Sequence, residues 1–272
     1  MPTPTFRLTS RQHAVVKTFR QAAADPDDAA GVVGVLLEGA HLIGDALAAG
    51  ARVHTVIVSS DFLATSSGSD RRIVDAAARA GANVYEGTNP VLEAASPVRT
   101  TSGIVALAAW RPAPLASTFE PAPALVLGLV DVQDPGNVGA VVRSADALGA
   151  TGVATLDRTA HPGGWKALRG AMGSTFRVPV ARGDAASAIQ TARAAGLRIA
   201  VTTVENATPL ERIDFTRPLL VLLGNEGAGL PAEIVDGADD RLSVPMRAGV
   251  DSLNVAVTAA LVLYEAARQR RS

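Results

Sequence analysis

Apolar residues recur along the chain with the two periods that distinguish strands from helices. Apolar runs of strand length predict buried strands at 32–38, 53–58, 103–110, 124–132, 152–156, 176–180, 197–203 and 219–223. Apolar residues at every third or fourth position predict helices at 10–24, 41–49, 71–80, 138–148, 166–172 and 184–195. Strands that alternate with helices are typical of an α/β fold, here with a parallel sheet in the C-terminal part that is covered on both faces.

A last helix is predicted to begin near Ser252, whose hydroxyl is a natural helix cap. Its apolar residues have the spacing of a single apolar stripe. The members of this stripe are Leu253, Val257, Ala260, Leu261 and Tyr264.

A proline-rich stretch divides the chain into two parts. The segment from Trp110 to Pro123 contains four prolines among small residues, and proline disfavours both helices and central strands. We therefore predict a stiff linker at 113–123 between an N-terminal domain at 1–112 and a C-terminal domain at 124–272. The N-terminal domain is expected to be the smaller α/β sandwich, with a loop of Thr, Ser and Gly at 65–69.

Composition narrows the possible classes of function. The chain has 272 residues, 48% of them hydrophobic, which is enough for two packed domains. It has no cysteine, which excludes disulfides, thiolate–zinc sites and cysteine nucleophiles, and its four histidines lack metal-ligand spacing, so no metal is expected. No apolar window approaches the ~20 residues of a membrane helix, and the N-terminus lacks a signal-peptide pattern. We therefore expect a cytoplasmic protein without a membrane partner.

Charge is balanced overall and basic at the N-terminus. The net charge of −1 argues against a protein that coats nucleic acid nonspecifically, because such binding needs many phosphate contacts. The first 20 residues contain no acid, and Arg169 adds a further candidate cation later in the chain. The N-terminal basic residues are Arg7, Arg11, Lys17 and Arg20. They are interpreted either as phosphate-binding groups or as ordinary surface cations, since a GC-rich genome also favours arginine.

Three polar segments stand where predicted strands end or helices begin. The first has Asn137 at the expected N-cap of a helix and Arg143 on the solvent side of that helix. The second, Gly-Asn-Glu-Gly-Ala-Gly at 224–229, lets the backbone approach a ligand closely and contains Glu226. The third, Ser-Leu-Asn at 252–254, places a hydroxyl and an amide at a helix start, which suits a phosphate or carboxylate. Each segment alone also has a structural interpretation: a solvated arginine, a strand-to-helix turn and a helix cap.

Together these segments resemble the three signature motifs of the SpoU/TrmH family of the SPOUT superfamily, whose members are RNA ribose 2'-O-methyltransferases. The order and the domain-sized spacing of the motifs carry the resemblance, which covers about residues 124–270. Upstream, residues 36–39 (Leu-Leu-Glu-Gly) and 100–104 (Thr-Thr-Ser-Gly-Ile) are more loosely similar to the family's N-terminal RNA-binding domain. That domain is itself similar to a kink-turn-binding ribosomal protein fold.

The resemblance implies a C-terminal SPOUT domain with a parallel sheet and a deep trefoil knot, and a homodimer. A knot does not follow from periodicity, because knots are rare. The resemblance also implies S-adenosylmethionine as cofactor and RNA as partner, chiefly large-subunit (23S) ribosomal RNA. The implied cofactor-binding residues are Leu223, Gly224, Val244, Met246 and Leu253. The implied catalytic residues are Asn137, Arg143, Glu226, Ser252 and Asn254.

Two roles for Arg143 remain open. The resemblance makes it the candidate base, with Ser252 and an RNA phosphate setting its state. A guanidinium, however, is normally never deprotonated in proteins. Arg143 could instead bind the phosphate beside the target ribose, leaving water or a backbone group to accept the proton.

Three other functions are considered. Transfer RNA could be the substrate, or the chain could be a noncatalytic RNA-binding or ribosome-assembly factor. The intact polar residues at all five signature positions argue against the noncatalytic factor. A nucleotide-binding metabolic enzyme is disfavoured because Gly136 and Gly139 lack the third glycine of the dinucleotide-binding motif.

Overall fold

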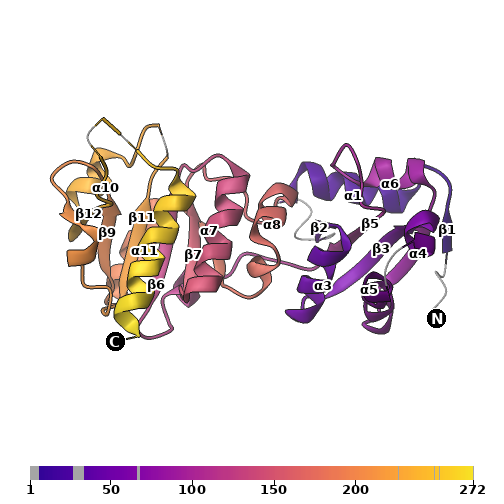
Figure 1. Ribbon diagram of the computed structural model, residues 1–272, viewed down its shortest axis with the longest axis horizontal. Helices are drawn as coiled ribbons and strands as arrows, with labels where there is room; N and C mark the ends of the chain where they lie inside the picture. The colour runs from indigo at the N-terminus through magenta and orange to yellow at the C-terminus, as the bar shows by residue number, and fades with distance from the viewer. Residues whose placement is uncertain are drawn as a thin grey trace. The chain divides into compact units, whose positions relative to one another are not determined.

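The chain forms two compact α/β units, each with its own sheet (Figure 1). The computed structural model describes residues 6–26, 34–65, 68–225, 227–247, 249–250 and 252–271. The first unit comprises Met1–Arg111 and Gly163–Phe176. The second comprises Pro112–Pro162 and Arg177–Ser272.

The first unit is built on a five-stranded sheet in the order β1-β4-β3-β5-β2. Its strands are β1 (Phe6–Leu8), β2 (Val35–Glu38), β3 (Val53–Ser59), β4 (Asn83–Gly87) and β5 (Ile104–Ala108). Helices α1 (Ala14–Ala24) and α6 (Asn89–Ala95) pack on one face, and α3 (Ala40–Ala48) and α5 (Gly68–Arg79) pack on the other. A short helix, α4 (Ser60–Thr65), follows β3. Alternate residues of β2 and β5 enter the two cores because successive side chains of a strand point to opposite faces.

The edge strand β2 of this sheet is covered by α8 (Trp165–Ala171). Leu168 is buried in the core beneath α3 and α5, while Trp165 packs against the core beneath α1 and α6. The Trp110 Nε1 donates a hydrogen bond to the carbonyl oxygen of Thr175 at 3.2 Å. A segment from the second half of the sequence therefore completes the first unit and covers a strand edge whose backbone groups would otherwise be open to pairing.

The second unit is built on seven parallel strands in the order β10-β12-β9-β11-β6-β7-β8. These strands are β6 (Leu125–Val130), β7 (Gly152–Leu156), β8 (Val180–Gly183), β9 (Arg198–Thr202), β10 (Thr208–Pro209), β11 (Leu219–Leu223) and β12 (Asp240–Ser243). One face packs against α9 (Ala185–Ala194) and α10 (Ala232–Asp236). Helices α7 (Pro135–Leu148) and α11 (Val255–Arg270) pack side by side and lie in front of the sheet in Figure 1. A 3-10 turn, η3 (Leu210–Arg212), follows β10.

The C-terminal end of α11 is fastened to the amino-end side of the sheet by Arg270. Its guanidinium donates hydrogen bonds to the carbonyl oxygens of Phe215, Pro123, Ala124 and Arg217, at 2.7–3.2 Å. Gln269 adds a bond from its Nε2 to the Ile213 carbonyl oxygen at 2.9 Å. Backbone carbonyls that precede β6 and β11 therefore find partners on the helix, as buried polar groups require.

Some predicted strands agree with the structure and one does not. The predicted strands at 152–156 and 219–223 are confirmed residue for residue by β7 and β11. The predicted strand at 176–180 is wrong, because residues 174–176 form a 3-10 turn, η2 (Ser174–Phe176), and β8 begins only at Val180. Part of the predicted loop at 65–69 is helical, since α5 begins at Gly68, while residues 66 and 67 lie outside the described residues.

The predicted linker at 113–123 does not form; this segment packs on the second unit. Ala113 pairs with Ala181 beside β8, and residues 115–118 form the 3-10 turn η1 (Leu115–Thr118). Thr118 and Phe119 are buried. The prolines disfavour long helices and central strands but do not prevent packing of the apolar residues between them.

We expect Glu265 of α11 to make stability depend on pH. Its side chain, 11% exposed, accepts hydrogen bonds from Arg268 Nε and Nη2 and from Gln269 Nε2 at 2.7–2.8 Å. The Arg268 guanidinium, followed by Gln269, lowers the pKa of Glu265 to about 2. In the unfolded chain the pKa of a glutamate carboxyl is about 4.3. The stabilisation from Glu265 is therefore complete at pH values above this pKa, and it is lost as the pH falls toward the pKa of Glu265 in the folded protein.

The Glu265→Gln variant should therefore unfold at a lower urea concentration at about pH 6, and its stability should fall less between about pH 5 and pH 2 than that of the wild type. Glu120→Gln, at an exposed position, serves as the control and should follow the wild-type profile. Parallel pH profiles for Glu265→Gln and the wild type would contradict this role.

Candidate active site

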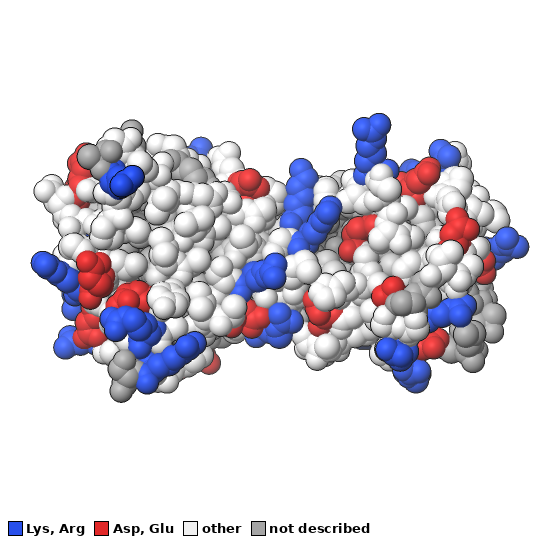
Figure 2. Space-filling view, viewed as in Figure 1, with Lys and Arg blue, Asp and Glu red and all other residues white. Residues whose placement is uncertain are grey.

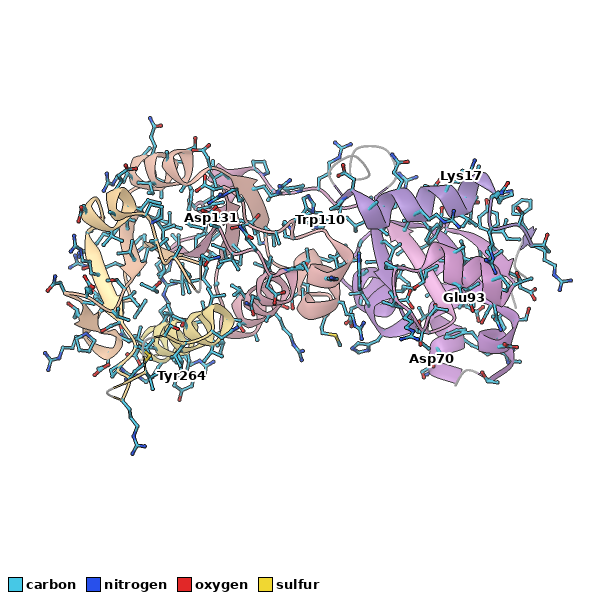
Figure 3. The ribbon with its side chains drawn as sticks, turned by 90° about the horizontal axis from the view of Figure 1, so that it is seen from above. Lys17, Asp70, Glu93, Trp110, Asp131 and Tyr264 are labelled. Atoms are coloured by element: carbon cyan, nitrogen blue, oxygen red, sulfur yellow. The ribbon has the colours of Figure 1, made fainter. Side chains whose placement is uncertain are left out.

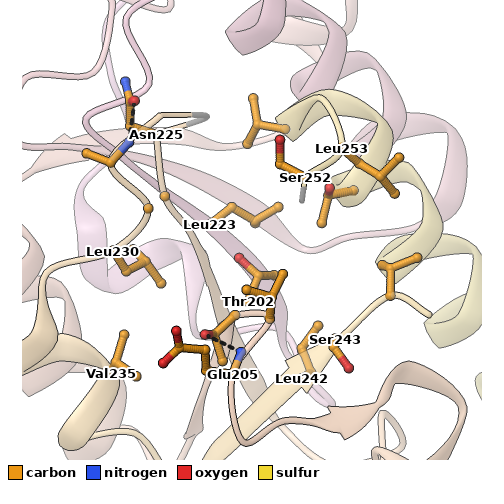
Figure 4. Close-up of a pocket in the computed structure, with 18 of the residues that line it drawn as sticks. Thr202, Glu205, Leu223, Asn225, Leu230, Val235, Leu242, Ser243, Ser252 and Leu253 are labelled. Carbon is orange, nitrogen blue, oxygen red and sulfur yellow. Dashed lines mark hydrogen bonds between the residues drawn. The ribbon is translucent and has the colours of Figure 1, made fainter. Parts of the chain in front are cut away.

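The candidate site lies where the parallel strands of the second unit end. Their carboxyl ends share one edge of the sheet, which is the usual ligand position in open α/β folds. A cavity of about 470 Å³ lies among the ends of β9, β11 and β12 and the start of α11 (Figure 4). This volume falls within the range of small-molecule sites. The residues expected at the cofactor all line it, namely Leu223, Gly224, Val244, Met246 and Leu253.

Gly224 is required by close packing of the loop that follows β11. A Cβ atom at this position would lie 2.6 Å from the Leu230 nitrogen and would also meet the carbonyl carbon of Gly229. The clash is with backbone atoms, which cannot rotate away as a side chain could. The loop therefore folds back on its own start, and only glycine fits there.

Asn225 shapes the same loop and ties it to the end of β6. Its Oδ1 accepts hydrogen bonds from the nitrogens of Gly227 (2.8 Å) and Ala228 (3.2 Å), while its Nδ2 donates to the carbonyl oxygen of Asp131 at 3.1 Å. Asn225 lies at the rim of the cavity in Figure 4. One side chain thus joins the loops that follow β6 and β11.

Asp131 is held in an uncommon conformation by Arg158 from the loop that follows β7. The φ of Asp131 is 57°, a value that residues other than glycine seldom adopt. Its carboxylate accepts hydrogen bonds from the Arg158 nitrogen (3.0 Å) and Nη2 (2.9 Å), and the Arg158 side chain lowers the pKa of Asp131. Asp131, Arg158 and Asn225 form a chain of contacts that we call the loop latch. Sequence analysis missed it because its members are far apart in sequence.

The start of α7 differs from the prediction. Asp134, not Asn137, caps the helix, because its Oδ1 accepts a hydrogen bond from the Gly136 nitrogen at 2.7 Å. Asn137 lies in the first turn of α7. Its side chain is therefore not the cap of this helix.

The start of α11 also differs from the prediction. The cap is Asn254 instead of Ser252: its Oδ1 accepts hydrogen bonds from the nitrogens of Ala256 (2.9 Å) and Val257 (3.3 Å). The Nδ2 of Asn254 then donates to Asn137 Oδ1 at 3.0 Å. Ser252 is exposed and lines the cavity. The first and third sequence motifs are thereby brought together.

The other two expected catalytic residues are placed differently. Arg143 is exposed on α7, six residues beyond Asn137, which is roughly 9 Å along the axis at about 1.5 Å per residue. Glu226 lies outside the described residues. The structure therefore joins Asn137 to Asn254 and places Ser252 at the cavity, while the roles of all five residues stay predictions.

The basic residues expected to contact RNA are exposed on the first unit, and they are Arg7, Arg11, Lys17, Arg20 and Arg169. Lys17 lies on the outer side of α1 (Figure 3). Arg20 also has a structural contact, because its Nε donates to the Ala94 carbonyl oxygen of α6 at 3.0 Å. Figure 2 shows basic and acidic side chains interspersed on the visible face of this unit.

Among the described residues, no group of three or more His, Asp or Glu side chains could hold a metal ion. None of the helices described has the length and apolarity needed to cross a membrane.

Sequence comparisons identify relatives for both units. Residues 124–264 match the model of the SpoU rRNA Methylase family. The 23S rRNA (guanosine(2553)-2'-O)-methyltransferase RlmP of Bacillus subtilis is 32% identical over 229 residues, which are 84% of this chain and 86% of RlmP. An uncharacterized tRNA/rRNA methyltransferase of Mycolicibacterium smegmatis is 39% identical over 152 residues, 56% of this chain and 48% of that protein. The match thus spans about half the length of the mycobacterial relative.

Solved structures of similar architecture extend over nearly the whole chain. An AdoMet-bound rRNA methyltransferase from Sinorhizobium meliloti superposes with a TM-score of 0.83 at 28% identity, covering 96% of this chain and 97% of that one. The SpoU methyltransferase AviRb from Streptomyces viridochromogenes, in complex with AdoMet, has a TM-score of 0.83 at 26% identity, covering 96% and 99%. Both of these proteins are described as binding the same cofactor.

We expect Asn225→Ala to weaken binding of S-adenosylmethionine by about tenfold. The substitution removes the bonds that shape the loop after β11, and leaving a hydrogen-bonding group without a partner costs roughly 1–3 kcal/mol. Cofactor affinity can be measured by calorimetry. Asn83→Ala, an exposed position in the first unit, is the matched control, and equal affinities for both variants would contradict the role of the loop latch.

Proposed function

The chain belongs to the SpoU rRNA Methylase family, and we propose that its substrate is a ribose 2'-hydroxyl of large-subunit ribosomal RNA. The activity of an RNA ribose 2'-O-methyltransferase with S-adenosylmethionine as cofactor follows from this membership. The choice of RNA is supported by RlmP, which is named for 23S rRNA. Such a substrate makes the cytoplasm the proposed place of action.

The cavity suits the cofactor in size and in chemistry. Its wall combines apolar side chains, such as Leu223 and Leu253, with backbone groups of the loop that begins at Gly224. Close approach to that loop is possible because Gly224 has no side chain. Val244 and Met246, from the segment after β12, would complete the binding site. When bound there, S-adenosylmethionine supplies an activated methyl group, so positioning of the ribose is the main task left to the protein.

The convergence of Asn137, Asn254 and Ser252 beside this cavity is the observation that carries the proposed mechanism. Asn137 and Asn254 would hold the starts of α7 and α11 together at the reacting ribose, and Glu226 would orient substrate or cofactor. Arg143 would bind the phosphate next to that ribose, as guanidinium groups do through forked hydrogen bonds. Because a guanidinium normally stays protonated, we assign the proton of the 2'-hydroxyl to water.

We propose that the second unit is the SPOUT domain with its trefoil knot. β12 lies beyond β9 in the sheet, yet the helix that follows it packs against α7. The described residues 244–247, 249–250 and 252–254 therefore lead across the ends of β9 and β11, beside the loop that Asn225 holds to Asp131. Passage of the chain past a closed loop is what a knot requires. The first unit, with its exposed basic residues, is proposed as the RNA-binding domain.

We further propose that two copies of the chain associate through α11. The apolar stripe predicted for this helix is largely exposed: Val257 is 48% exposed, Leu261 37% and Tyr264 64%. The helix has a second apolar face, including Val255, Ala259 and Val262, which is the face that is buried. Tyr264 lies on the outer side of α11 in Figure 3, and the visible surface over α7 and α11 has few charges in Figure 2. A contiguous apolar strip of this kind is typical of an interaction surface.

Arg143→Ala should lower methyl transfer by roughly 100-fold or more, because a charged contact to the phosphate beside the reacting ribose is lost. Its affinity for S-adenosylmethionine should be unchanged. The measurement is transfer of labelled methyl groups to fractionated ribosomal and transfer RNA, followed by mapping of the modified ribose. Arg212→Ala, another exposed arginine of the second unit, is the control. Full turnover by Arg143→Ala would exclude both roles considered for it, and labelling of transfer RNA alone would exclude the proposed substrate.

Leu261→Glu should convert a dimer into a monomer, because it places a charge in the centre of the exposed apolar stripe. Sedimentation equilibrium measures the mass directly. Phe6→Glu changes an equally apolar residue that is 54% exposed on the first unit, and it should leave the mass unaltered. A dimer that survives Leu261→Glu would show that α11 is not the interface.

A further inference from the structure

Glu205 is the only charged side chain among the described residues that line the cavity. It follows β9, where its backbone nitrogen donates to Thr203 Oγ1 at 3.3 Å. In Figure 4 its carboxylate lies near Val235, at the end of the cavity remote from Ser252. No sequence motif marks this residue, and the mechanism proposed above does not use it.

A carboxylate in this position can only accept hydrogen bonds, so it selects a ligand group that donates them. The proposed function places S-adenosylmethionine in this cavity, and the inference rests on that placement. The cofactor offers three kinds of donor: the hydroxyls of its ribose, the amino group of its adenine and the ammonium of its amino-acid part. The surroundings of Glu205 decide among them.

Beside Glu205, the cavity has the hydroxyl of Thr203 and several apolar side chains. Leu230, Val235 and Leu242 line it, and Leu242 is fully buried. Such walls suit a flat purine ring and disfavour a zwitterionic amino acid, which keeps its hydration better in the open. The methyl group must instead lie toward Ser252 and Asn254, where the proposed catalytic residues gather. The ribose links these two ends.

We propose that Glu205 binds the hydroxyl groups of the cofactor's ribose. The carboxylate has two acceptor oxygens and can serve two neighbouring hydroxyls at once, which is the way an acidic residue recognises a ribose in dinucleotide-binding folds. Glu205 thus fixes the nucleoside part while leaving the sulfur end free to face the RNA. It is a binding residue and takes no part in the transfer itself.

The test compares three ligands in calorimetry: S-adenosylhomocysteine, 5'-methylthioadenosine, which lacks the amino-acid part, and 5'-methylthioinosine, which also lacks the adenine amino group. Glu205→Ala should bind each about tenfold more weakly than the wild type, as loss of a charge-assisted hydrogen bond predicts. Glu205 is exposed on a loop, so the variant is expected to fold. Glu211→Ala removes an exposed carboxylate outside the cavity and should match the wild type.

Each alternative has its own outcome. If Glu205→Ala weakens the binding of S-adenosylhomocysteine alone, Glu205 contacts the ammonium group. If it weakens the binding of both adenine-containing ligands but not that of 5'-methylthioinosine, Glu205 contacts the adenine amino group. Either result overturns the proposal. Steady-state methylation adds a second readout, in which Glu205→Ala should raise KM for the cofactor about tenfold with kcat nearly unchanged, since uniform binding is lost. Failure of the wild type to bind S-adenosylhomocysteine would contradict the proposed function itself.

Discussion

The hydrogen bond from Asn254 Nδ2 to Asn137 Oδ1 is the contact on which the site depends. It joins residues 117 positions apart in sequence. Because the oxygen of Asn254 caps α11, the same side chain determines where that helix begins and which part of α7 it meets. Arg270 fastens the other end of α11 to backbone carbonyls. Because α11 is held at both ends, its first turn forms a fixed wall of the cavity. The opposite walls are the ends of β9, β11 and β12.

Residue patterns predicted the core strands of the second unit well. They predicted the ends of its helices less well. Strands such as β11, five apolar residues in a row, leave little choice of structure. Helix starts were misplaced because several residues that can cap a helix occur within a few positions. Asp134 caps α7 where Asn137 was expected, and Asn254 caps α11 where Ser252 was expected. Periodicity also does not say which side of α11 meets the sheet, because that helix is apolar on two sides. Short or polar strands, such as β12 (Asp-Arg-Leu-Ser), carry no signal of their own.

The residues expected at the cofactor line the cavity, and their roles stay predictions. The order of the three polar segments marked the residues around the cavity, including Gly224 and Leu253. The contacts that support them were not predictable, because Asp131, Arg158 and Asn225 come from three different loops and meet only once the sheet has formed. Glu205 was missed for the same reason. A single carboxylate after a strand has no distinguishing pattern until the cavity beside it is known.

The position of α8 limits how the two units can be separated by truncation or by recombination of the gene. The helix is encoded between β7 and β8, yet it supplies Leu168 and Trp165 to the cores of the first unit and covers β2. A fragment that stopped at Arg111 would lose this cover and present an open strand edge to other chains. The two halves of the gene are therefore not interchangeable modules: recombination near the proline-rich segment would leave the upstream product prone to aggregation unless a substitute for α8 came with it.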